Sequence, residues 1–272
     1  MPFSVTAEDL FSDGLESGDF SSTNAGGFAW TDGSWTTVVS DDTELAGSSS
    51  SPQPKATAAS FAGGDWTPYS GNNSIRFRYA AGAFMSEQRF NLGTAEKDIW
   101  ISYWLRVPTN FQHGTSSPTN HKLFALWMDD YSNKGAGPTV AWEFWGDGSG
   151  GSDLAFHYGS GGTGLGSHLQ LTPFISYPSD QGRWMHVVFH VNDSTSSGSN
   201  DGVIQMWRKW DGEGTYTKFH EKLDNDIAAP AGGPNGWEAG YLMGWANAAY
   251  SNNTEWLVDN FELANSDIWN VE

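Results

Sequence analysis

Carboxylates stand near both ends of the chain, each beside an apolar run that is typical of a β-strand. Glu16 and Asp19 lie in "SDGLESGDFSSTN", and Asp259 lies in "TEWLVDNFELANSDI". Several carboxylate oxygens brought together in this way are ligands that a hard cation prefers. The placement predicts that the two terminal regions meet in the fold, around a cation. The alternative is that the three residues only form turns and bind backbone donors.

The middle of the chain carries a second set of residues that could do chemistry. Successive side chains of a strand point to opposite faces, so alternation shows which residues share a face. In "RWMHVVFHVN" one face is wholly apolar, whereas the other mixes Trp184, His186 and His190. The same analysis of the neighbouring segments gives a polar and aromatic set: Glu143, Trp145, His157, His190, Gln205 and Trp207.

Such a set is suited to sugars, because indole rings pack on their C–H faces and polar side chains bind their hydroxyls. The sequence predicts a concave sheet face that binds a polysaccharide or glycan, with Trp145, Gln205 and Trp207 on that one face. The alternative is that the indoles pack beneath loops and the polar residues simply face solvent.

Strands of five to ten residues separated by turns rich in Gly, Asn and Ser must position these side chains. Helical periodicity is scarce. The predicted strands are 8–12, 28–33, 35–40, 74–80, 83–92, 98–107, 121–130, 139–147, 153–159, 183–192, 202–210, 240–248 and 255–264. The low-complexity stretch 46–60 predicts a flexible loop. The pattern predicts an all-β fold, a sandwich of two antiparallel sheets, as one domain over residues 1–272.

Composition narrows the classes of partner. Formal charge is −19, with 32 acidic and 13 basic residues, and no Lys or Arg precedes Lys55. This charge repels nucleic acid and anionic membranes, so neither is expected as a partner. No stretch is apolar enough for membrane insertion, and the absence of Cys excludes disulfides. The opening residues lack the pattern of a signal peptide, which predicts a cytoplasmic protein, or one at a virion surface or outside the cell after release.

Two segments carry a resemblance to a known superfamily. "GRWMHVVFHVN…NDGVIQMWRKWDG" and "SEQRFNLG…DIWISYWLRVP…NHKLFALW" resemble strands of concanavalin A-like lectin/glucanase jelly rolls. The likeness spans about residues 74–211 and is greatest to the polysaccharide-lyase-like branch of heparin, glucuronan and alginate lyases. The terminal motifs are also similar to those of marine phage and bacterial proteins of this type. The resemblance implies a jelly-roll β-sandwich.

The resemblance also implies two kinds of site. In similar jelly rolls an acidic residue near the N-terminus and an Asp on the last strand share a structural Ca²⁺, a pattern that Glu16, Asp19 and Asp259 match. No organic cofactor is implied. For a lyase, β-elimination on a uronate needs a neutralising group, a base and an acid. The residues that match these roles are Arg89, Lys122, His190 and Gln205.

Three function classes follow. The first, which we favour, is a non-catalytic carbohydrate-binding or surface-decoration protein, placed on a phage virion with other virion proteins as partners. The second is a polysaccharide lyase that cleaves an acidic glycan. The third is a purely structural virion protein. Glycoside hydrolysis is disfavoured, because the "ExDxE" arrangement of the related glucanases is missing and residue 145 is Trp.

Overall fold

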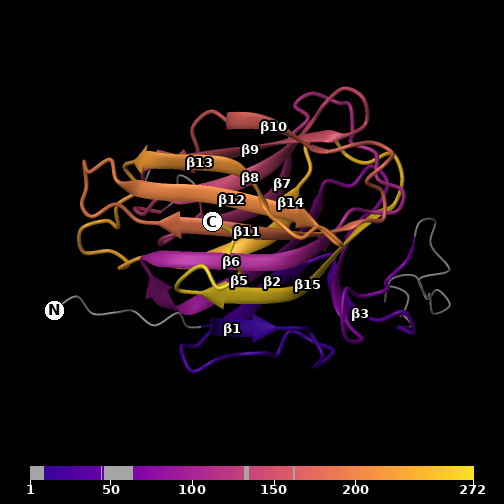
Figure 1. Ribbon diagram of the computed structural model, residues 1–272, viewed down its shortest axis with the longest axis horizontal. Coiled ribbons are helices and arrows are strands. Elements are labelled where there is room, and N and C mark those ends of the chain that lie inside the picture. The colour runs from indigo at the N-terminus through magenta and orange to yellow at the C-terminus, as the bar shows by residue number, and fades with distance from the viewer. Residues whose placement is uncertain (1–8, 44, 46–63, 132–134, 162) are drawn as a thin grey trace.

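Two antiparallel sheets make up the part of the chain that the computed structural model describes, residues 9–43, 45, 64–131, 135–161 and 163–272. The described residues contain no helix, and so none that could span a membrane. The fold is an all-β jelly-roll sandwich, as the sequence predicts (Figure 1). The predicted flexible loop at 46–60 lies outside the described residues.

Each sheet is assembled from strands that are far apart in the sequence. The eight-stranded sheet has the order β13 (Thr217–Asn225), β12 (Gly202–Trp210), β11 (Trp184–Asn192), β6 (Asp98–Arg106), β15 (Thr254–Ala264), β4 (Ser74–Tyr79) and β3 (Thr36–Val39), with β1 (Asp9–Asp13) paired to β15. The seven-stranded sheet has the order β10 (Leu169–Ile175), β9 (Ser152–Gly159), β8 (Thr139–Gly146), β7 (His121–Trp127), β14 (Trp237–Trp245), β5 (Met85–Glu96) and β2 (Ala29–Ser34).

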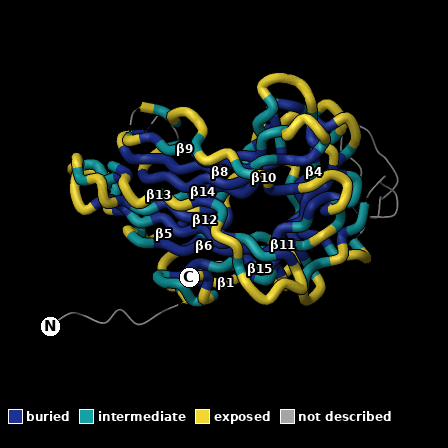
Figure 2. The backbone as a smooth tube through the Cα atoms, turned by 45° about the horizontal axis from the view of Figure 1, so that its top comes forward, coloured by how far each residue is buried: buried dark blue, intermediate teal, exposed yellow. Residues whose placement is uncertain are grey.

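The hydrophobic core lies between the two sheets. Alternation turns the apolar set of each strand inward, so Phe189 of β11 stacks on Phe124 of β7 with ring centroids 4.4 Å apart. Trp256 of β15 likewise stacks on Phe144 of β8 at 5.2 Å. Buried residues follow the strands, and exposed residues gather in the loops (Figure 2). Each sheet therefore has one face in the core and one outer face that is open to other uses.

The two terminal regions meet, as the sequence predicts. β15 pairs with β4 through residues 254–258 and with β1 through residues 261–264, on the same side of the strand. Between these two pairings, Asn260 has a positive φ of 47° and the register toward β6 shifts. Asp259 therefore lies at the junction where the first and last strands of the chain come together.

Candidate functional site

The outer face of the seven-stranded sheet brings three of the predicted site residues together. Glu143 and Trp145 point outward from β8, because Trp142 and Phe144 between and beside them point into the core. His157 points outward from the adjacent β9, opposite the buried Phe156. On the other side of β8, β7 places Lys122 directly opposite Glu143.

Glu143 is the centre of a polar network on this face. Its carboxylate forms an ion pair with Lys122. The second carboxylate oxygen, Oε2, lies 2.9 Å from His157 Nε2 and accepts a hydrogen bond of 2.9 Å from Asn120 Nδ2. The other ring nitrogen of His157 lies 2.8 Å from the Gly166 carbonyl oxygen. Since both partners of the ring are acceptors, an imidazole that donates from both nitrogens satisfies both.

Burial and charge set the protonation of the central pair. The Glu143 side chain is only 2% exposed, and burial alone would raise the pKa of its carboxyl. The hydrogen bond to His157 and the charge of Lys122 outweigh burial and lower this pKa to about 2. Burial lowers the pKa of Lys122, but the Glu143 charge and the Tyr131 hydroxyl outweigh it, so that the net shift is upward. The pair is therefore ionised at neutral pH.

Aromatic and basic groups continue the face toward β5. Tyr241 of β14 lies between Ala125 of β7 and Arg89 of β5, and its hydroxyl is 3.1 Å from that of Tyr131. Burial raises the pKa of Tyr241 well above its usual value, so its hydroxyl stays protonated. Arg89 donates to Glu87 at 2.7 Å, and its guanidinium carbon lies 5.7 Å from the Trp127 ring centroid. The face thus holds Arg89 and Lys122 together, each paired with a carboxylate.

The other predicted site residues lie on the far side of the molecule, on the outer face of the eight-stranded sheet. His190 Nδ1 is 2.8 Å from Gln205 Oε1, and His190 Nε2 is 2.8 Å from Asp98 Oδ1. The prediction that Trp145, Gln205 and Trp207 line one face is wrong, because β8 and β12 belong to different sheets. The set proposed for a lyase is divided in the same way, with Arg89 and Lys122 on one face and His190 and Gln205 on the other.

The chain itself covers part of this second face. Trp207 is 1% exposed and packs with Trp100 and Val271 beneath the C-terminal segment that follows β15. Trp269 anchors the segment by donating its indole N–H to Glu262 at 2.7 Å. The alternative in which an indole packs beneath neighbouring chain therefore holds for Trp207, and no sugar can stack on its ring.

The three predicted metal ligands near the termini do not share one set of partners, because Glu16 and Asp259 bind the 70–73 loop and Asp19 binds its own turn. Glu16 accepts hydrogen bonds from the backbone of Asn72 at 2.8 Å, and Asp259 accepts one from the backbone of Ser70 at 3.0 Å. Burial, with a smaller contribution from Glu16, raises the pKa of Asp259 to about 6. Asp19 is exposed and accepts from the Ser21 backbone. Within the described ranges no three acidic or histidine side chains lie together as a metal-binding group, so the predicted trio is not assembled.

A calcium ion at this junction stays a prediction, which Glu16 and Asp259 alone could support with oxygens of the 70–73 loop. If Ca²⁺ binds there, calcium at 100 times its dissociation constant stabilises the fold by about 2.7 kcal/mol. The expected result is a higher melting temperature after calcium is added to chelator-treated protein, and no such rise in the Glu16→Gln variant. Equal melting curves with chelator and with calcium would contradict the prediction.

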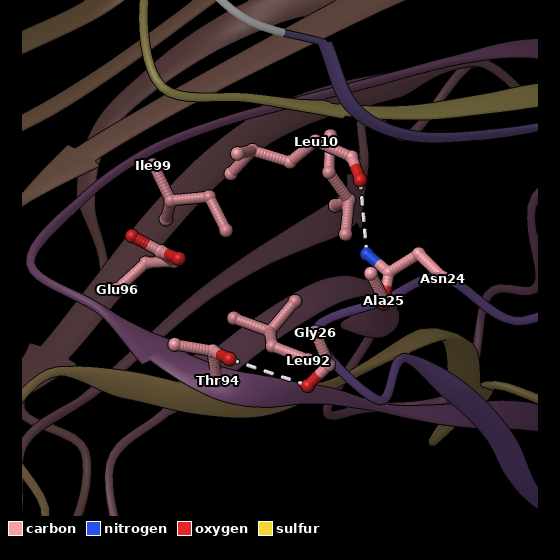
Figure 3. A pocket seen from close by; sticks show the side chains of 9 residues that line it. Leu10, Asn24, Ala25, Gly26, Leu92, Thr94, Glu96 and Ile99 are labelled. Atoms are coloured by element: carbon pink, nitrogen blue, oxygen red, sulfur yellow. Dashed lines mark hydrogen bonds between the residues drawn. The ribbon is translucent and has the colours of Figure 1, made fainter.

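A pocket at the edge of the sandwich is another candidate for the functional site. It has a volume of about 260 Å³ and lies between the sheets, with walls formed by Leu10, Leu92, Ile99 and Leu263 (Figure 3). Glu96 is the one ionisable group among its lining residues, and burial raises its pKa. A single carboxylate without a second ionisable group offers less acid–base chemistry than the network around Glu143.

Comparison with known proteins identifies the fold. No protein-family model and no curated protein matches the chain. Among solved structures, the marine PL-14 alginate lyase from Aplysia kurodai aligns with a TM-score of 0.53 at 13% identity, over 72% of this chain and 84% of that chain. A mutant of alginate lyase Aly36B in complex with alginate trisaccharide aligns with a TM-score of 0.53 at 11% identity, over 84% and 97%. Another mutant of that lyase, in complex with alginate tetrasaccharide, aligns with a TM-score of 0.51.

These alignments show a concanavalin A-like jelly roll of the kind that alginate lyases have, as the sequence resemblance implies. At such identities the likeness concerns the fold alone. The chemistry of this chain has to be inferred from its own side chains.

Four residues of the network were not predicted from the sequence: Asn120, Trp127, Tyr131 and Tyr241. Trp127 and Tyr241 lie on strands, where alternation analysis could have found them. Asn120 and Tyr131 lie in loops and reach the network through tertiary contacts that no local pattern encodes.

Proposed function

We propose that the outer face of the seven-stranded sheet binds a glycan without cleaving it. The observation that carries the proposal is the network of Lys122, Glu143 and His157, with Trp145 beside it on the same strand as Glu143. Hydrogen-bonding groups next to indole rings are what sugar recognition requires. The alignment with lyase structures that hold alginate oligosaccharides supports a glycan as the ligand class.

The pairing of charges on this face favours binding over catalysis. A lyase needs a cation that is free to neutralise a uronate carboxylate. Here Glu143 already neutralises Lys122, and Glu87 neutralises Arg89. The predicted proton-transfer residue His190 is on the opposite face. A place on a virus particle has no support in the contacts of the described residues, and it stays a prediction.

Substitution of Arg89 tests the binding face. Arg89 is 38% exposed, so it can reach a ligand while its loss leaves the core intact. A hydrogen bond to a charged group contributes about 1.5–3 kcal/mol, so Arg89→Gln should weaken binding of alginate oligosaccharides by about tenfold or more. Isothermal titration calorimetry measures the change in affinity. Neutral cello-oligosaccharides serve as a second set of ligands.

The chain offers a matched control outside the seven-stranded sheet, in the residue that precedes β11. Arg183 is 42% exposed, donates to Asp180 at 2.7 Å and lies over the Trp210 ring at 4.1 Å, as Arg89 does with Glu87 and Trp127. Arg183→Gln should bind like the wild type. Equal affinities for the two variants, or no binding of any glycan by the wild type, would overturn the proposal.

One observation favours a lyase as the second candidate function. Lys122, Arg89 and the protonated hydroxyl of Tyr241 share one face, which would supply a cation and an acid for β-elimination where a uronate displaces Glu143 or Glu87 from its cation. Incubation with alginate, glucuronan and heparin, followed by ultraviolet absorbance of the unsaturated uronate product, decides between the two. Product that forms in wild type and fails to form in Lys122→Met would replace the binding function with the lyase.

A further inference from the structure

An exposed pair of stacked aromatic rings lies at the end of β5 and β14. Phe84 is 42% exposed and Trp245 is 47% exposed, yet their rings are parallel to within 11° and 5.3 Å apart. Backbone pairing fixes them side by side, because Ala246 N donates to the Phe84 carbonyl at 2.7 Å. Within the described ranges, this is the one stacked pair in which both rings are exposed. The pair therefore presents a fixed, solvent-facing aromatic surface on which a flat apolar group can pack.

A hydrogen-bonded bridge connects this pair to the network around Glu143. The indole N–H of Trp245 donates to Asn247 Oδ1 at 2.9 Å, and Asn247 Nδ2 donates to Asn120 Oδ1 at 2.9 Å. The two asparagines also share a backbone hydrogen bond of 3.0 Å. Asn120 in turn donates to Glu143 at 2.9 Å. The orientation of the Trp245 ring is thus set relative to the binding face by an unbroken chain of contacts.

We propose that Phe84 and Trp245 form a stacking platform for a distal sugar ring of the glycan that the network binds. The inference rests on the proposed function and adds a second subsite to it. The indole N–H is already satisfied by Asn247, so the ring offers its flat face, which is what the C–H face of a pyranose packs against. The hydrogen bonds through Asn247 and Asn120 connect this platform to the polar network around Glu143.

The small size of the platform argues for a sugar over a protein partner. A stable protein interface buries about 800 Å² on each side, whereas one aromatic side chain buries about 150–250 Å² even when it is fully covered. Two half-exposed rings therefore fall well short of such an interface.

Affinity as a function of oligosaccharide length tests the subsite. Trp245→Ala should weaken binding of an alginate hexasaccharide by about tenfold, because the ring face that packs on the distal sugar is lost. Binding of a disaccharide that occupies only the network around Glu143 should not change. Trp245→Phe keeps a stacking ring and should retain most of the hexasaccharide affinity. Leu223→Ala, an equally exposed apolar position on β13 of the other sheet, is the control and should bind like the wild type.

The outcomes separate this inference from the proposed function. If the wild type binds both oligosaccharides and Trp245→Ala binds the hexasaccharide equally well, the platform is wrong and the binding face stands. A variant that loses the disaccharide and the hexasaccharide to the same degree also overturns a distal subsite. If the wild type binds no glycan, both proposals fall. A wild-type dimer that Trp245→Ala converts to monomers would assign the rings to contact between copies of the chain.

Discussion

Acidification is expected to destabilise this protein strongly, well above the pH at which most of its carboxylates are protonated. Burial lowers the pKa of four of the buried histidines: His113, His121, His186 and His220. The pKa falls to about 3 for His121 and His186 and to about 4 for His220. We expect the free energy of unfolding to fall by several kcal/mol between about pH 6.5 and about pH 4.5.

The direction follows from proton binding. The unfolded chain binds a proton at His121, His186 and His220 near the ordinary pKa of 6.5, whereas the folded chain does so only near pH 3–4. The pKa of His113 is shifted in the same direction. Between these values the unfolded state holds more protons at these histidines, so the stability that their neutral rings contribute is fully present above pH 6.5 and is lost as the pH falls. Asp259, whose pKa is raised to about 6, offsets part of this loss because the folded state takes up its proton first. Each pKa unit corresponds to about 1.36 kcal/mol, so each fully shifted histidine costs about 2–3 kcal/mol at about pH 4.5.

The local contacts explain why these rings stay neutral. His113 and His121 stack with centroids 4.1 Å apart, and protons on both would place two positive charges in contact. Each donates from Nε2 to a backbone carbonyl at 2.6 Å, that of Thr119 for His113 and that of Ala248 for His121. The neighbouring charges of Asp147 and Glu143 act in the opposite direction but do not outweigh burial.

Urea unfolding, followed by tryptophan fluorescence at about pH 7.5 and about pH 5, measures the loss. In His121→Gln the free energy of unfolding should depend less steeply on pH, although the variant is less stable than the wild type at neutral pH. A wild type whose free energy of unfolding stays constant across this range would contradict the interpretation. So would a His121→Gln variant whose pH dependence is as steep as that of the wild type.

The sequence predicted the inward and outward faces of single strands well, because that division depends on local alternation. It could not predict which outer faces coincide. β7 to β10 lie in one sheet and β11 to β13 in the other, and the switch occurs in the connection between Ile175 and Trp184. Trp145 and Trp207 have equivalent local patterns, yet they lie on opposite sides of the sandwich. Only the pairing of strands distant in the chain, such as β7 with β14, makes this distinction.

Two strands escaped the prediction for a related reason. β10 and β13 are at the edge of their sheets, where one side is not paired. Most residues of β13 are exposed or half-buried, and β10 contains Pro173, which weakens a strand pattern. The burial of Trp207 could not be predicted from local sequence either, because a segment more than fifty residues later in the chain covers it. Local periodicity reports core-facing residues and carries no information on such coverage.

Replacement of Glu143 by Gln should be among the most destabilising single changes on the proposed binding face. Glu143→Gln preserves the shape of the side chain but removes its charge, which leaves Lys122, 19% exposed, without its anion. Removing one partner of a buried ion pair costs about 3–5 kcal/mol, because the other charge remains desolvated. His157 and Asn120 lose their charged acceptor in the same step.

A neighbouring pair on the same face supplies the control. Glu87 pairs with Arg89, but that guanidinium is 38% exposed and can be solvated when its partner is lost. Glu87→Gln should therefore cost about 1 kcal/mol or less. Urea unfolding measures both variants, and equal losses would show that burial of the Lys122–Glu143 pair is not what makes it important.

The double variant Glu143→Gln, Lys122→Met separates the cost of a stranded charge from the value of the pair itself. A buried ion pair that is replaced by uncharged side chains of similar volume often costs little, so the double variant should be more stable than Glu143→Gln alone. A double variant that is no more stable than the single one would contradict this explanation. If the double variant is also nearly as stable as the wild type, the ion pair is kept at a site where uncharged residues fold almost as well. That result would indicate that the charges of Lys122 and Glu143 are kept mainly because they bind the ligand. Their contribution to folding stability would then be the smaller reason for the network on this face.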